Sequence, residues 1–266
     1  MPLMSWQWRR VSALAQALVP LKDLVQAKTR LAGLLDPSQR RALAQAMVED
    51  VLAVLAAHPE IRRTTLVSDD PGAGLLAEKY AVDYVPESSL GCRGLNAVVQ
   101  RASEQLLAKD ESPLVVLHGD LPLLSYHDIS VVLKAQRQLN GLVVACDRQG
   151  RGTNLLAFAA SCAPRFRFGP DSCARHLAWA HSAAIPVRVL QRLGIGLDID
   201  EAADLKVLMA SPRSEPRSKT LALLGDGELA ARLALALATL PEESPQQNAT
   251  DAAASGENTM DTGSGN

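Results

Sequence analysis

Short apolar runs alternate along the chain with longer segments in which apolar residues recur at helical spacing. The runs are typical of buried β-strands, and the periodic segments are typical of helices with one apolar face. The predicted strands are residues 13–19, 64–67, 82–85, 114–117, 142–145 and 187–190, and the main predicted helices are 37–58, 95–107, 129–139 and 172–183. The first helix has a well-defined start, because Asp36, Pro37 and Gln39 match the capping-box pattern with proline in the first turn.

Alternating strands and helices predict an α/β fold, with a mostly parallel central sheet and helices on both faces. Ligands of such sheets bind beyond the carboxyl ends of the strands, so residues that directly follow each predicted strand are candidates for chemistry. We expect a single domain over residues 11–210, a linker and helix over 211–240, and a disordered tail over 241–266.

The C-terminal region changes composition twice. Residues 221–240 are rich in Ala and Leu and predict one helix, which packs either on its own domain or on a second copy as a homodimer. Residues 241–266 contain few bulky apolar side chains, so they cannot bury enough surface to offset the entropy of ordering. This tail has five acids and no Lys or Arg.

Charge and hydropathy exclude two classes of partner. The net charge is −2, which gives no electrostatic basis for nucleic-acid binding, and the part before the acidic tail suits small anionic ligands. No stretch approaches the ~18 apolar residues of a membrane span. Residues 9–19 resemble a signal peptide only faintly, so we interpret them as leading into a strand and expect a cytoplasmic protein.

The four cysteines are Cys92, Cys146, Cys162 and Cys173, and none forms a CxxC pair. This pattern predicts free thiols in a reducing compartment. A bridge between two of them stays open, because spacing alone does not show which residues meet.

A basic loop follows the first predicted strand. Lys22, Lys28 and Arg30 are placed where cations could bind a polyphosphate, with a solvated loop as the alternative. The chain contains no GxxxxGK[ST] motif and no GxGxxG motif. A P-loop ATPase and a dinucleotide-dependent oxidoreductase are therefore disfavoured.

Acidic residues follow two later segments. Asp120 comes after the strand at 114–117, and Asp198 and Asp200 stand two apart in an extended stretch, where both face one side. Carboxylates at a sheet edge suit Mg²⁺, which prefers oxygen ligands and substrate phosphates. The alternatives are helix capping by Asp120 and a helix start at Asp200.

Two glycine-containing loops could bind a small anion. Residues 150–154 include Thr153, and residues 168–172 include Gly169 and Ser172. Glycine lets backbone N–H groups approach an anion, the hydroxyls add donors, and Ser172 opens a predicted helix. Ordinary turns would have a similar composition.

Taken in their order along the chain, the motifs resemble those of the guanylyltransferases of deazaflavin coenzyme F420 biosynthesis. These enzymes join GMP to a small phosphorylated three-carbon acid. The resemblance covers about residues 13–210 and rests on Val19-Pro20-Leu21-Lys22-Asp23, Ala27-Lys28-Thr29-Arg30-Leu31, Val67-Ser68-Asp69-Asp70-Pro71, Gly94-Leu95-Asn96, His118-Gly119-Asp120-Leu121-Pro122-Leu123, Asp147-Arg148, Gly152-Thr153-Asn154, Phe168-Gly169-Pro170 and Leu197-Asp198-Ile199-Asp200.

The resemblance implies a single Rossmann-like nucleotidyltransferase domain and a role for each candidate residue. GTP and a three-carbon phospho-acid would be the substrates, with Mg²⁺ as cofactor. The implied assignments are Ser68, Gly94 and Asn96 for the nucleotide, Thr153, Gly169 and Ser172 for the acceptor, Asp120, Asp198 and Asp200 for the metal, and Lys22, Lys28, Arg30 and Asp120 for catalysis.

One departure from the family pattern affects the acceptor. Cys173 stands where the family often has an aromatic residue, which predicts a larger pocket and makes 3-phosphoglycerate a candidate beside phosphoenolpyruvate and 2-phospholactate. Two alternatives remain open. One is a related transferase acting on molybdopterin or a sugar phosphate, and the other is a non-catalytic nucleotide-binding protein.

Overall fold

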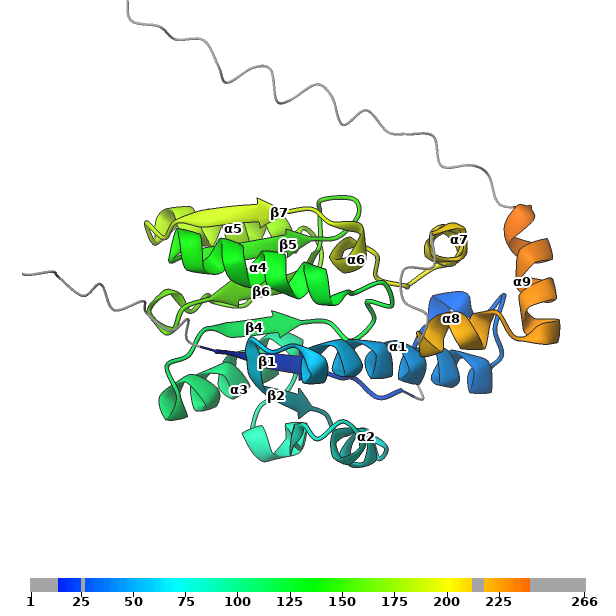
Figure 1. The fold of residues 1–266 in the computed structure, drawn as a ribbon, viewed down its shortest axis with the longest axis horizontal. Coiled ribbons are helices and arrows are strands. Elements are labelled where there is room, and N and C mark those ends of the chain that lie inside the picture. The colour runs from blue at the N-terminus through cyan, green and yellow to red at the C-terminus, as the bar shows by residue number, and fades with distance from the viewer. Residues whose placement is uncertain (1–13, 25–26, 212–217, 240–266) are drawn as a thin grey trace, which may run out of the picture.

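The computed structural model describes residues 14–24, 27–211 and 218–239. The predicted tail over 241–266 and the residues before 14 lie outside this part of the chain. A seven-stranded sheet in the order β3-β2-β1-β4-β6-β5-β7 forms the centre (Figure 1). The strands are β1 (Ala15–Pro20), β2 (Ile61–Val67), β3 (Asp83–Val85), β4 (Leu114–Leu117), β5 (Leu142–Cys146), β6 (Thr153–Phe158) and β7 (Val187–Leu190).

The sheet is parallel except for β6, which runs antiparallel to both β4 and β5. The predicted fold class is confirmed, but β6 is missing from the predicted strands. A hairpin loop connects β5 to β6, and Asp147 holds it by accepting hydrogen bonds from the backbone N–H groups of Arg151 (2.8 Å) and Gly152 (2.7 Å). Because β6 is reversed, its first residues, Thr153 and Asn154, lie at the carboxyl ends of β4 and β5.

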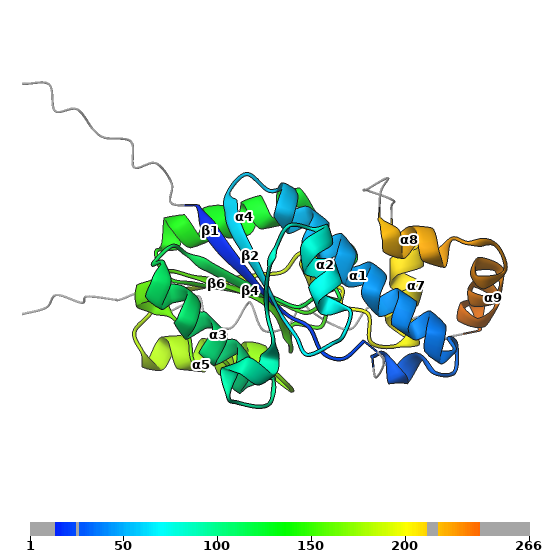
Figure 2. The same cartoon turned by 90° about the horizontal axis from the view of Figure 1, so that it is seen from below.

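Helices cover both faces of the sheet. The helices of the described chain are α1 (Pro37–Ala57), α2 (Ala73–Lys79), α3 (Leu95–Lys109), α4 (Tyr126–Leu139), α5 (Ser172–Ser182), α6 (Leu193–Gly196), α7 (Ala202–Ala210), α8 (Lys219–Leu224) and α9 (Gly227–Ala238). Helices α1, α2 and α4 lie on one face, and α3 and α5 lie on the other (Figure 2). The predicted capping box is confirmed, because the side chains of Asp36 and Gln39 each accept a hydrogen bond from the other's backbone N–H.

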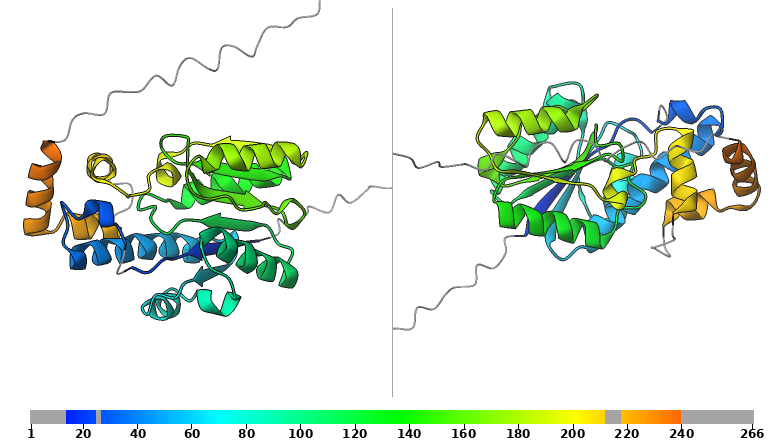
Figure 3. Two further views of the ribbon diagram at one scale, coloured as in Figure 1. Left: turned by 180° about the vertical axis from the view of Figure 1, so that it is seen from behind. Right: turned by 90° about the horizontal axis from the view of Figure 1, so that it is seen from above.

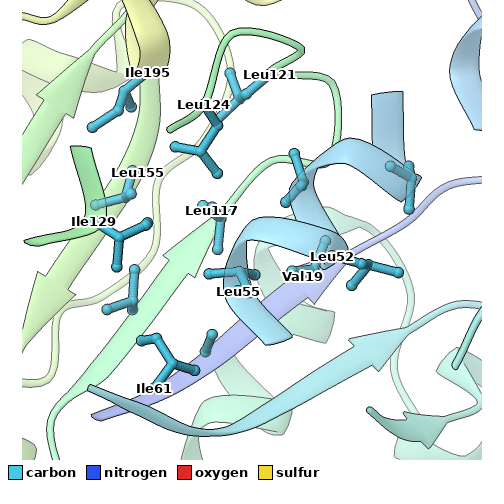
Figure 4. Packing of buried hydrophobic residues seen from close by; sticks show 14 of the residues in the cluster. Val19, Leu52, Leu55, Ile61, Leu117, Leu121, Leu124, Ile129, Leu155 and Ile195 are labelled. Atoms are coloured by element: carbon cyan, nitrogen blue, oxygen red, sulfur yellow. The ribbon is translucent and has the colours of Figure 1, made fainter. Parts of the chain in front are cut away.

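Two cores sandwich the sheet, because successive strand residues point to opposite faces. On the α1 and α4 side, Leu117 and Leu155 of neighbouring strands pack with Leu52 and Ile129 from the two helices (Figure 4). The adjacent residues Val116 and Leu156 belong to the core under α3 and α5. Every strand of the sheet centre is therefore anchored on both faces, which gives the loops at its carboxyl edge a rigid base.

A third core lies beyond the carboxyl edge of the sheet, where α7, α8 and α9 gather (Figure 3). Leu224, Leu233 and Leu237 from the last two helices are buried there with Leu43 and other residues of the first half of the chain. The prediction of one helix over 221–240 is wrong, because Gly225 and Asp226 separate α8 from α9. Both described helices pack on their own chain.

The expectation of four free thiols is wrong for one pair. Cys146 at the end of β5 and Cys173 in the first turn of α5 form a disulfide, with their Cα atoms 6.1 Å apart. The two residues meet because α5 packs across β5 in the same buried cluster. Cys92 and Cys162 are free. Within the described residues, no helix is long and apolar enough to cross a membrane.

The docking of α8 depends on one carboxylate. Asp50 of α1 accepts hydrogen bonds from Ser218 Oγ (2.8 Å) and from the backbone N–H groups of Lys219 (2.7 Å) and Thr220 (3.0 Å). It thereby satisfies N–H groups at the helix start that have no partner within the helix.

We expect Asp50→Ala to lower the free energy of unfolding by about 2 kcal/mol, since charged hydrogen bonds to the helix start are lost. Urea denaturation and hydrogen exchange of the α8 amides measure this. Asp226→Ala is the matched control, because Asp226 precedes α9 but its side chain makes no capping hydrogen bond. Unchanged protection of α8 in Asp50→Ala would contradict the assigned role.

Candidate active site

A cavity of about 680 Å³ opens at the carboxyl edge of the sheet. Its walls come from the loop after β1, the end of β4, the start of β6, the loop before α5 and the acidic stretch before α7. Most of the predicted site residues line it, namely Lys22, Lys28, Asp120, Thr153, Gly169, Ser172, Asp198 and Asp200. Segments far apart in the sequence therefore meet at one site, beyond the carboxyl edge of the sheet.

Lys28 lies between two of the acids. Its Nζ is 2.6 Å from Asp120 Oδ2 and 2.9 Å from Asp200 Oδ1, and only 7% of its side chain is exposed. Burial works to lower the pKa of Lys28, but the two carboxylates outweigh it and raise that pKa above its ordinary value. The residue also has a left-handed backbone, with φ of 56°, which is uncommon outside glycine. A charged lysine is thus fixed on the cavity wall.

Two of the acids are held in different electrostatic environments. Burial, and then the charge of Asp120, raises the pKa of Asp198 to about 6. For Asp120, burial acts in the same direction, but the Lys28 ammonium outweighs it and lowers the pKa of Asp120. Asn154 Nδ2 fixes Asp198 by donating to its Oδ1 (3.0 Å) while also donating to the carbonyl of Ile195 (2.9 Å). A negative charge on Asp198 is therefore only partly compensated.

The structure contradicts the capping interpretations of Asp120 and Asp200. Ser125, not Asp120, caps α4. Glu201 caps α7 and Asp204 completes that capping box, so Asp200 is free of the capping role and bonds Lys28 instead. All three acids therefore present carboxylates to the cavity rather than to a helix end.

These carboxylates have the chemistry of a magnesium site, but they do not form a closed one. Within the described chain, no three His, Cys, Asp or Glu side chains converge as a preformed metal centre. Lys28 already contacts one oxygen of Asp120 and one of Asp200. Since Mg²⁺ often takes one or two carboxylates and completes its shell with phosphates and water, the donor set fits an ion that binds together with a nucleotide.

Another part of the cavity lining offers neutral donors. Thr153 begins β6, Ser172 begins α5, and both are buried with surfaces that line the cavity. Between them, Gly169 has φ of +116°, a conformation that side-chain-bearing residues rarely adopt. Hydroxyls and glycine backbone grouped in this way suit a small anion.

Four predicted residues lie outside the cavity lining. Arg30 is exposed in a 3-10 turn, and Gly94, with φ of +87°, precedes α3. Ser68 is buried, and its Oγ accepts a hydrogen bond from the N–H of Asp70, whose carboxylate in turn accepts one from the N–H of Leu24. Through this chain of hydrogen bonds, Ser68 helps to hold the basic loop in place.

Asn96 is the fourth of these residues, and its amide makes two hydrogen bonds to the backbone of one neighbour. Asn96 Oδ1 accepts from the N–H of Phe168 (2.6 Å), and Nδ2 donates to the carbonyl of Phe168 (3.0 Å). In this structure Asn96 holds the loop before α5.

Among the lining residues that were not predicted as site residues, three support the site through their side chains. Asn154 holds Asp198, Asp147 holds the β5–β6 hairpin, and His118 packs edge-on against Phe168 with ring centroids 5.0 Å apart. The sequence carried a signal for each, because all three belong to motifs on which the family resemblance rests. Their roles depend on hydrogen bonds and ring contacts that spacing does not encode.

Comparison with solved structures shows that the fold is shared with proteins of the nucleotidyltransferase class. The chain superposes on a nucleotide-diphospho-sugar transferase candidate from Desulfovibrio desulfuricans with a TM-score of 0.69 and 19% identity, over 84% of this chain and 98% of the other. A nucleotidyl transferase from Methanothermobacter thermautotroptrophicus matches with a TM-score of 0.50 and 16% identity, over 73% and 95% of the two chains. At these identities the likeness concerns the fold.

Sequence comparison gives the family. Residues 15–220 match the family model described as "Guanylyl transferase CofC like", and the chain belongs to this family of guanylyltransferases. It is 36% identical to the phosphoenolpyruvate guanylyltransferase of Conexibacter woesei, covering 72% of this chain and 86% of the relative. Proteins of the same name from Chloroflexus aggregans (34%; 73% and 96% covered) and Roseiflexus castenholzii (38%; 74% and 88% covered) are similarly related. The resemblance seen in the sequence is confirmed.

The raised pKa of Asp198 predicts a stability penalty. A carboxyl group whose pKa is higher in the folded than in the unfolded protein favours folding at low pH, where it is protonated. This contribution is lost as the pH rises through the folded-state pKa of about 6. We expect Asp198→Asn to be about 1–3 kcal/mol more stable than wild type at pH 7.5 and equally stable below about pH 3.

Chemical denaturation of both proteins across this pH range measures the difference. The low-pH values serve as the control, because Asp198 is then neutral in both states. A variant that is less stable than wild type at pH 7.5 would show that the charge of Asp198 is fully compensated.

Proposed function

We propose that this guanylyltransferase transfers GMP from GTP to the phosphate of a small three-carbon phospho-acid and releases pyrophosphate, as a step of coenzyme F420 biosynthesis. The observation that carries this proposal is the meeting of Lys28 and three carboxylates with the Thr153, Gly169 and Ser172 end in one cavity. Cations and carboxylates suit a triphosphate with its metal, and the neutral donors suit a small acid. The names of the relatives support guanylyl transfer to such an acid.

The reaction is an in-line displacement. An oxygen of the acceptor phosphate attacks the α-phosphorus of GTP, and the bond from that phosphorus to the bridging oxygen of the β-phosphate breaks. The attacking oxygen is already anionic near neutral pH, so no general base is required. This agrees with His118, whose pKa burial lowers, so that its ring is neutral. Catalysis consists of positioning two anions and compensating their charge.

The chain's own residues divide this task. Lys28 and Lys22 face the triphosphate, with Lys28 held in place by the acids that it contacts. Asp120, Asp198 and Asp200 would hold Mg²⁺, which would neutralise charge on the phosphates. Thr153, Gly169 and Ser172 would orient the acceptor.

The acceptor that we propose first is phosphoenolpyruvate, the compound in the relatives' names. The expectation of 3-phosphoglycerate rested on a pocket enlarged by Cys173. In the structure Cys173 is buried, bonded to Cys146 and absent from the cavity lining, so it does not enlarge the cavity. 3-Phosphoglycerate and 2-phospholactate remain alternatives of the same chemical class.

We expect an equimolar mixture of GTP, ATP, CTP and UTP with the three acids and Mg²⁺ to give one main product, a GMP adduct of a three-carbon acid. Mass spectrometry identifies the adduct, and pyrophosphate release measures its rate. Reactions without acceptor or with excess chelator are the controls. Turnover of glucose 1-phosphate in place of the acids, or pyrophosphate release without any acceptor, would overturn the proposal.

Asp120→Asn tests the catalytic role of the Asp120 carboxylate, which is one of the two that contact Lys28. Loss of one electrostatic contact in a transition state costs about 3–4 kcal/mol, so kcat should fall by roughly a hundredfold or more. Asp83→Asn is the matched control, because Asp83 lies on β3 and pairs with Arg63 outside the cavity. Circular dichroism should show both variants folded. Normal turnover of Asp120→Asn would remove this residue from the mechanism.

A further inference from the structure

His176 of α5 is a fully buried histidine with both ring nitrogens hydrogen-bonded. Its exposed fraction is 0%; Nε2 lies 3.0 Å from the backbone nitrogen of Arg167, and Nδ1 lies 3.1 Å from Thr153 Oγ1. The backbone N–H of Arg167 can only donate, so Nε2 is the acceptor and the neutral ring carries its proton on Nδ1. Burial, and then the charges of Arg175 and Arg167, lowers the pKa of His176 to about 4, which keeps the ring neutral.

This proton arrangement fixes the role of the Thr153 hydroxyl. The Nδ1–H of His176 donates to Thr153 Oγ1, so the hydroxyl acts as acceptor in that bond. A hydroxyl carries one proton besides its lone pairs, and that proton must point to another partner. Among the described residues, Thr153 Oγ1 has no partner other than His176, and Thr153 lines the cavity. The free donor is therefore available to a ligand.

The same ring also fixes the neighbouring loop. His176 holds the N–H of Arg167, and its ring packs edge-on against Phe168 with centroids 5.3 Å apart. On the far side, Asn96 binds both backbone groups of Phe168. This loop leads directly into Gly169, so one imidazole links two of the segments that form the anion end of the cavity.

We propose that His176 is a positioning residue, whose Nδ1–H sets the Thr153 hydroxyl as a hydrogen-bond donor to an anionic oxygen of the acceptor. The ring itself does not touch the substrate. The inference rests on the proposed function for the identity of the ligand, whereas the proton arrangement is a property of the protein alone.

The kinetic test compares His176→Leu, which removes both ring bonds, with His176→Gln, whose amide can donate to Thr153 and accept from Arg167. With phosphoenolpyruvate as acceptor, His176→Leu should raise the acceptor KM by about 10- to 100-fold, as for loss of a hydrogen bond to a charged group. The KM for GTP should stay within about twofold, since the nucleotide end is not contacted. His176→Gln should recover most of the loss.

A double-variant cycle separates positioning from general destabilisation. Thr153→Val should raise the acceptor KM by itself, and adding His176→Leu to it should change the KM little, because the hydroxyl to be oriented is gone. Additive losses would mean that His176 acts independently of Thr153, and an unchanged acceptor KM in folded His176→Leu would overturn the inference. If His176→Leu does not fold, the position of the ring proton in the wild-type protein still decides the inference.

Nitrogen-15 NMR of ring-labelled histidine gives a result that does not depend on turnover. In the substrate-free protein at pH 7, His176 should show a protonated Nδ1 and an unprotonated Nε2. A proton on Nε2, or a charged ring, would overturn the inference. A wild-type protein that transfers no GMP would overturn the proposed function instead, and the location of the ring proton would still decide the role of His176.

Discussion

The reversed direction of β6 is the constraint on which the site depends. In a fully parallel sheet, the residues at the start of a strand lie at the edge opposite the ligand. Because β6 runs against β4 and β5, Thr153 and Asn154 instead lie at the carboxyl edge, where the backbone N–H of His118 bonds to the carbonyl of Asn154 (3.0 Å). Asn154 then fixes Asp198, and Thr153 lines the cavity. The antiparallel direction of β6 thus places two residues of the cavity lining.

The charges at this edge are arranged for ligands rather than for stability. Lys28 compensates Asp120 and Asp200 directly, whereas Asp198 is fixed by the neutral amide of Asn154. A buried carboxylate without a cationic partner is costly, and this cost appears in the raised pKa of Asp198. Sites that bind charged substrates commonly retain such a cost, since a fully compensated cluster would have less to gain from a cation or phosphate.

The sequence predicted what depends on pattern and order, but not what depends on individual hydrogen bonds. The strand over 114–117 and the acids that follow it were found because buried runs and carboxyl-edge residues are visible in one dimension. The strand residues 155–158 were not predicted, because the glycines before them are typical of a ligand-binding loop as well as of a hairpin turn. Asn96 belongs to a motif of the family, yet its amide binds the backbone of Phe168. The pairing of Cys146 with Cys173 required the packing of α5 on β5.

The C-terminal helices reach the chemistry through the alternation of residues 197–200. Leu197 and Ile199 are buried in the third core with Leu224 and Leu233, while Asp198 and Asp200 line the cavity. In an extended segment these two sets must face opposite sides. Packing of the apolar pair against α8 and α9 therefore determines where both carboxylates point. Helices that contribute no residue to the cavity lining thus help to form the site, because removing their apolar surface would free the segment that carries two of its three acids.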